Sequence, residues 1–110
     1  MPLKTLARLK GLSVGGTDVT DAGLKQLVGK NDLELLGLDH TTITDSGLEH
    51  LTGLVNLQHL NLEGTQVSDD GLAHLKTLAN LKRLHIKGTK ITDAGLRGFR
   101  QAKPKVGIRR

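Results

Sequence analysis

The sequence contains no cysteine, tryptophan or tyrosine, and Phe99 is its only aromatic residue. Without cysteine the chain can form no disulfide, no zinc finger of the usual kind and no thiol nucleophile. A compact globule of this size normally uses several aromatic side chains to fill its centre, so an aliphatic interior favours a thin, repetitive core. At 110 residues there is room for one domain, which we expect to span residues 1–110.

Long apolar runs are also missing. No stretch reaches the roughly 18 apolar residues of a membrane-spanning helix. The start of the chain, Met1-Pro2-Leu3-Lys4, lacks the apolar stretch of a secretory signal. We therefore expect no membrane association, and a cytoplasmic location as the default for a chain that is not cut from a longer protein.

The formal net charge of +5 is distributed unevenly along the chain. Residues 33–56 carry four acidic side chains and no basic one, whereas residues 81–110 carry ten basic side chains against Asp93 alone. The chain is therefore better described as a charge dipole than as a uniformly basic protein.

A period of 24 residues runs through the sequence. Threonine recurs at this spacing, and so do aspartate and glycine: Thr17, Thr41, Thr65, Thr89; Asp21, Asp45, Asp69, Asp93; Gly23, Gly47, Gly71, Gly95. We expect four full repeats at residues 9–32, 33–56, 57–80 and 81–104, with part of a unit at residues 3–8 and the start of a fifth strand at residues 105–110.

Each unit predicts a strand, a turn and a helix. In the third unit Leu60 and Leu62 alternate with period two, as in a strand with one buried face, and Leu72, Leu75 and Leu78 predict one face of a helix. Ser68 and Asp69 at the expected helix start, like the threonine–aspartate pairs of the other units, predict a hydroxyl N-cap and a carboxylate that complements the helix dipole. Gly71 and its equivalents predict a close approach between neighbouring units that a Cβ would obstruct.

The pattern LxxLxLxxT followed by [IV]-[ST]-D-x-G-L-x-x-L resembles the leucine-rich-repeat family over about residues 3–108. The bacterial version with 24-residue repeats matches best. It is similar to the cysteine-containing subtype of F-box adaptor proteins, with threonine in place of cysteine. The resemblance implies a right-handed, curved α/β solenoid with parallel strands on the concave face and helices on the convex face. It implies no specific ligand, because the fold has many unrelated partners.

Side chains that lie between the strand leucines point away from the core and form ladders across a parallel sheet. These positions vary from repeat to repeat while the leucines do not, so the fold leaves them available for binding. We predict a scaffold or adaptor that binds a protein partner through the concave face, with these contact residues: Leu35, Asp39, His59, Asn61, Glu63, Arg83, His85 and Lys87.

Several alternatives stand beside this prediction. In the simplest alternative, the concave face is only a solvated surface that binds no partner. Nucleic acid or another polyanion could bind the basic residues 81–110, although no aromatic platform for base stacking exists. His59 and His85 with Glu63 and Asp39 nearby could hold zinc, but no second-shell partner can be assigned, and we expect no metal and no cofactor. No serine lies in a nucleophile context, and the aspartates are periodic, so we expect no enzyme.

The ends of the chain leave two possibilities open. The expected units begin in mid-repeat, which is typical of a piece of a longer array, and the edge strand at Leu12–Val14 could instead mediate self-association. The sequence therefore predicts either a monomer or edge-mediated association of copies.

Overall fold

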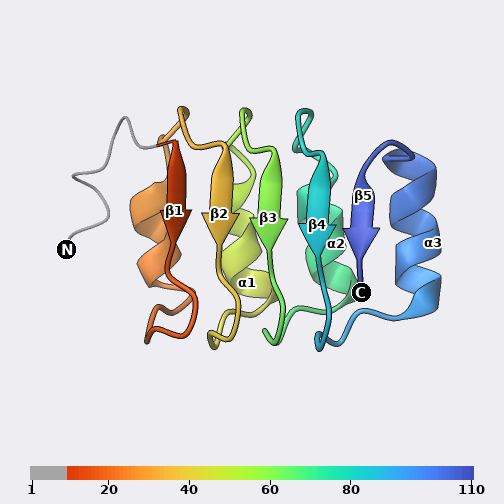
Figure 1. Ribbon diagram of the computed structural model, residues 1–110, viewed down its shortest axis with the longest axis horizontal. Coiled ribbons are helices and arrows are strands. Elements are labelled where there is room, and N and C mark those ends of the chain that lie inside the picture. Colours follow the sequence, from red (N-terminus) through yellow and green to blue (C-terminus); the bar gives the residue numbers. More distant parts are fainter. Residues whose placement is uncertain (1–9) are drawn as a thin grey trace.

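The computed structural model describes residues 10–110, which form a parallel five-stranded sheet with helical segments behind it (Figure 1). The strands follow one another across the sheet in sequence order: β1 (Gly11–Ser13), β2 (Leu35–Gly37), β3 (His59–Asn61), β4 (Arg83–His85) and β5 (Gly107–Arg109). Every strand pairs with the next at an offset of 24 residues, as Leu36 with Leu60 and Leu60 with Leu84. Each repeat therefore contacts its neighbours in sequence, and the fold is an α/β leucine-rich-repeat solenoid. The predicted partial unit at residues 3–8 and the first residue of the repeat at 9–32 lie outside the described residues.

The strands bury one set of side chains and expose the other, as the alternation predicts. Leu60 and Leu62 are fully buried, whereas His59 and Asn61 between and beside them are partly exposed. Equivalent leucines and isoleucines stack along the solenoid into one continuous aliphatic core, to which Phe99 adds the only buried ring among residues 10–110. The core therefore has the repetitive, thin form that the scarcity of aromatic residues indicates.

The helical segments become longer toward the C-terminus: η2 (Gly23–Leu27), α1 (Asp45–Leu48) with η3 (Glu49–Leu51), α2 (Asp69–Leu75) and α3 (Asp93–Ala102). The prediction of a helix face through Leu78 was too long, because α2 ends at Leu75 and Leu78 is buried in the turn that follows. A leucine spacing of three fits the 3.0 residues per turn of the 3₁₀ helix, and η2 and η3 have this form. None of these helices has the length and apolar composition needed to cross a bilayer.

The periodic aspartates join one repeat to the next. Asp45 accepts hydrogen bonds from the backbone amide of Ser68 (2.7 Å) and from its hydroxyl, in the following repeat. Asp69 accepts the equivalent pair from Thr92, at 2.8 and 2.6 Å, and Asp21 accepts from Thr44 at 2.8 and 2.5 Å. The prediction of a structural role was correct, but these carboxylates bind the next repeat as well as lying at helix starts.

The expected hydroxyl caps are present only in part. The hydroxyls of Thr44 and Thr92 accept from amides of their own helices, whereas the Ser68 side chain makes no cap hydrogen bond and donates to Asp45 instead. The hydroxyl at this position therefore has the preceding repeat's carboxylate as its regular partner.

Gly47, Gly71 and Gly95 each make room for the aspartate of the preceding repeat, whereas a Cβ on Gly23 would meet, among the described residues, only Val19 and Thr20 of its own repeat. A Cβ on Gly71 would overlap Oδ1 of Asp45 and would lie 2.8 Å from Cδ1 of Leu48. A Cβ on Gly95 would overlap the carboxylate of Asp69 in the same way. This confirms that the glycine permits the close approach of two repeats.

Candidate functional site

Three ladders of side chains cross the exposed face of the sheet, which we call the sheet face. The strand pairing confirms the first ladder as Gly11, Leu35, His59, Arg83, Gly107 and the second as Ser13, Gly37, Asn61, His85, Arg109. A third ladder lies at the strand exits, where backbone hydrogen bonds from Gly16 to Asp39, from His40 to Glu63 and from Gly64 to Lys87 continue the register. All eight predicted contact residues belong to these three ladders.

A hollow of about 350 Å³ lies over β1 to β4 on this face. Leu36 and Leu60 lie at its base, and small residues of the first two strands border it on one side. It brings together six of the eight predicted residues: Leu35, Asp39, His59, Asn61, Arg83 and His85. Leu35 is 46% exposed here because it lies on the outward side of β2, whereas the next residue, Leu36, is buried in the core.

Two further hollows continue from the first toward the C-terminal end. One of about 260 Å³ shares Arg83 and His85 with it and adds Arg109 and Ile108. The other, of about 350 Å³, is lined by the two remaining predicted residues and three more: Glu63, Lys87, His85, Arg109 and Arg110. The site therefore extends over β5. Arg109 was missed as a site residue, although its place in the second ladder could have identified it.

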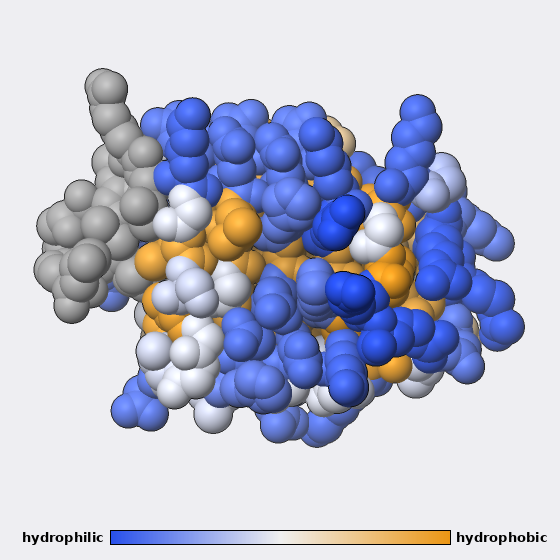
Figure 2. Space-filling model, viewed as in Figure 1, coloured by the Kyte–Doolittle hydropathy of each residue, from blue (hydrophilic) through white to orange (hydrophobic). Residues whose placement is uncertain are grey.

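The surface changes in character along the sheet face. Figure 2 shows hydrophobic and neutral surface over β1 and β2, and the most hydrophilic side chains over β4 and toward β5, where some hydrophobic surface also shows between them. The neutral part follows from Gly11, Ser13 and Gly37 beside Leu35, and the hydrophilic part from the arginines and lysine of the last two strands. The sheet face therefore changes from small and neutral over the first two strands to basic over the last two, with Asp39 and Glu63 at the strand exits between them.

Two contacts fix polar side chains around the site. The Oδ1 atom of Asn61 accepts a hydrogen bond from the backbone amide of Glu63 at 3.0 Å. Nε2 of His40 lies 4.0 Å from Oε1 of Glu63. His40 has a φ of 55°, a left-handed conformation that glycine adopts at the equivalent positions 16, 64 and 88. The other three repeats have glycine at this position, so His40 is where the second repeat departs from the others.

The arrangement offers little for metal or covalent chemistry. Within residues 10–110 no three histidine, cysteine or acidic side chains converge on a point that could hold a metal ion. The zinc alternative built on His59 and His85 therefore has no geometric support in the described part of the chain. What remains is a shallow face with one apolar side chain and several charged ones, which is the chemistry of a binding surface.

Comparison with known proteins places the chain in a class. Residues 53–76 and 77–99 match the family described as "Leucine Rich repeat". Internalin C2 from Listeria monocytogenes is a similar solved structure, with 28% identity, a TM-score of 0.70 and coverage of 88% of this chain and 50% of that one. A leucine-rich-repeat protein of Leptospira interrogans is 22% identical, with a TM-score of 0.64 over 96% of this chain and 32% of that one. No curated protein matches the chain.

The actin-binding site 2 of leiomodin-1 also shares the fold, with a TM-score of 0.74, 15% identity and coverage of 99% of this chain and 78% of that one. The chain spans half of the internalin structure and about a third of the Leptospira one. Two of its repeats resemble the leucine-rich-repeat family, and it shares the fold of these proteins, which supports a protein-interaction scaffold in general. The likeness to the cysteine-containing subtype stays a prediction.

Proposed function

We propose that this chain is an interaction module that binds a protein partner on the sheet face. The observation that carries the proposal is the hollow over β1 to β4, in which a half-exposed leucine lies among polar side chains with no role in the core. Protein interfaces commonly combine an apolar anchor with arginine and a polar surround. The contact residues we propose are the eight of the sequence prediction, Leu35, Asp39, His59, Asn61, Glu63, Arg83, His85 and Lys87, together with Arg109.

The size of the face supports this proposal. The molecule measures 38 × 25 × 19 Å, and the sheet face lies across its two longer axes (Figure 1). A standard interface takes roughly 800 Å² from each partner, which a face of these dimensions can supply. The matched leiomodin-1 segment is named as an actin-binding site, so a solenoid of similar length can bind a protein. At 15% identity it gives no reason to expect the same partner.

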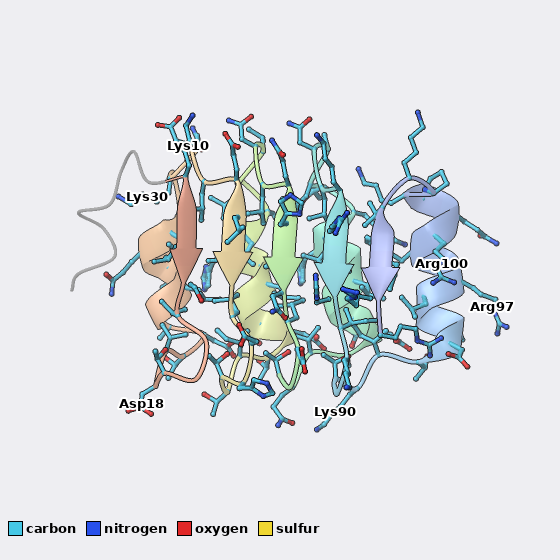
Figure 3. The ribbon with its side chains drawn as sticks, in the orientation of Figure 1. Lys10, Asp18, Lys30, Lys90, Arg97 and Arg100 are labelled. Carbon is cyan, nitrogen blue, oxygen red and sulfur yellow. The ribbon has the colours of Figure 1, made fainter. Side chains whose placement is uncertain are left out.

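Affinity capture with two matched double variants tests the proposal. Leu35→Ser with Arg83→Glu changes the sheet face, and Val28→Ser with Arg97→Glu makes the same chemical changes elsewhere. Val28 is 62% exposed after η2, and Arg97 projects from α3 away from the sheet (Figure 3). We expect at least one protein to be retained by the unaltered chain and the second variant and lost from the first, with all three giving the same circular dichroism spectrum. If every captured protein is retained equally by both variants, the sheet face is not the binding surface.

A further inference from the structure

The apolar and the basic parts of the sheet face lie in one continuous depression. Arg83 lines both the first and the second hollow, and Arg109 lines both the second and the third. A ligand that contacts Leu35 on β2 can therefore reach Arg83 on β4 and Arg109 on β5 without leaving the surface. The route crosses the strands at right angles and follows the first two ladders.

The basic side chains along this route have no acidic partners of their own. Arg83, Lys87 and Arg109 are exposed, and within residues 10–110 none of them forms an ion pair. Arg110, in contrast, is paired with Asp93. Three uncompensated cations on one face create a positive potential that attracts an acidic ligand.

The acidic side chains of the same face lie at the strand exits, in the third ladder. Asp39 lines the first hollow together with Leu35, and Glu63 lines the third hollow and lies 4.0 Å from Nε2 of His40. Neither carboxylate lines the second hollow, which joins Arg83 to Arg109. The acidic residues of a ligand therefore meet the two arginines at the second hollow, while its apolar residue lies in the first.

We propose that the partner presents an acidic peptide segment with one apolar residue, which contacts Leu35 while the acidic residues reach Arg83 and Arg109. This inference rests on the proposed function and adds the chemistry of the partner. Strands lie about 4.8 Å apart, so Arg83, two strands away in the same ladder, is about 10 Å from Leu35. Arg109 is three strands away and two residues further along its strand, which makes about 16 Å. An extended peptide advances about 3.3 Å per residue, which places the acidic residues three and five positions after the apolar one.

A protein segment fits this face better than a nucleic acid. Single-stranded nucleic acids bind through stacking on aromatic side chains as well as through phosphate contacts. Phe99, the only phenylalanine, tyrosine or tryptophan of the chain, is fully buried, and the face carries only the smaller imidazole rings of His59 and His85. The exposed Leu35 and the hollow around it would remain unused by a phosphate backbone, whereas an apolar side chain fills them.

Fluorescence anisotropy with labelled nonapeptides tests the inference on the full chain. The probe is Gly-Ser-Leu-Gly-Ser-Glu-Ser-Glu-Gly, and the control probes replace its leucine by serine, replace its two glutamates by glutamine, or place the glutamates directly after the leucine. We expect the first probe to bind at about 50 mM salt, where charge interactions are weakly screened, and each control to bind about tenfold more weakly. Leu35→Ser and Arg83→Glu are each expected to weaken binding of the first probe about tenfold, and Val28→Ser and Arg97→Glu to change it less than twofold.

Two results would overturn the inference. One is that a single-stranded oligothymidylate of nine nucleotides binds at least as tightly as the peptide and is insensitive to Leu35→Ser, which would identify a general polyanion surface. The other is that the peptide does not bind the unaltered chain. If the capture experiment still separates the two double variants in that case, the sheet face binds a protein of different chemistry and only the acidic-segment inference fails.

Discussion

Replacing Gly71 by alanine tests the contact between two repeats directly. The added Cβ would overlap Oδ1 of Asp45 and lie 2.8 Å from Cδ1 of Leu48 and 2.9 Å from Cγ1 of Val67. Overpacking of this kind costs roughly 1–3 kcal/mol. Displacing Asp45 also weakens its two hydrogen bonds to Ser68, each contributing about 0.5–1.5 kcal/mol. Because alanine is a better helix former than glycine, the substitution also adds about 0.5–1 kcal/mol to the free energy of unfolding, which offsets part of this loss.

The net expectation is a loss of about 1–3 kcal/mol in the free energy of unfolding, which lowers the Tm of a domain of this size by roughly 5–20 °C. The chain has no tryptophan or tyrosine, so urea and thermal unfolding should be followed by circular dichroism. Gly98→Ala is the matched control, because Gly98 lies inside α3 and a Cβ there meets no atom within 4 Å among the described residues. That variant should be about 0.5–1 kcal/mol more stable than the unaltered chain. Equal stabilisation by both alanines would refute the steric reasoning.

Three further outcomes follow from single residues. Leu60→Asp places a charge at a fully buried position, so we expect a loss of more than about 4 kcal/mol and a circular dichroism spectrum of an unfolded chain at 25 °C. Hydrogen bonds from the Thr92 hydroxyl and amide lower the pKa of Asp69; the stability it contributes is present above the unfolded pKa of about 3.9 and is lost as the pH falls through the lowered folded pKa. The midpoint urea concentration should therefore fall less steeply at acid pH in Asp69→Asn than in the unaltered chain. Asp70→Asn, on the same helix turn but without such bonds, should leave this pH dependence unchanged. His40→Gly removes a left-handed non-glycine residue and should raise the free energy of unfolding by about 1 kcal/mol in a urea titration.

The register of the sheet could be predicted because the period fixes it. Any residue and its counterpart 24 positions later occupy neighbouring strands, so the ladders through Leu35 and His59 follow from the sequence once the repeat length is known. The inward side of each strand follows from the leucines by the same reasoning. The periodic threonines also have equivalent roles. The hydroxyls of the buried Thr41 and Thr65 donate to carbonyls three residues earlier in their own turns, both at 2.7 Å.

Contacts between repeats could not be predicted in the same way. An aspartate at a helix start satisfies the dipole argument whether or not it binds a second repeat, so the bonds from Ser68 to Asp45 left no separate signal. The length of each helix could not be predicted from the leucine spacing either, because leucines three residues apart suit both an α-helix and a 3₁₀ helix. The hollow beside Leu35 is bordered by Ser13 and Gly37 from two different strands, which only the arranged strands show.

The side chains that join the repeats differ from those we propose for binding. The bonds between repeats lie in the connections, where aspartates bind the next helix start and Asn56 and Asn80 donate to carbonyls of the preceding repeats at 2.7 Å. The aliphatic core lies behind the sheet and packs the strands of successive repeats together. Among the described residues, no such bond uses the side chain of Leu35 or Arg83. Substituting both should therefore leave the urea midpoint within about 0.5 kcal/mol of the original, and a larger loss of stability would mean that the sheet face contributes to folding and is not free for binding.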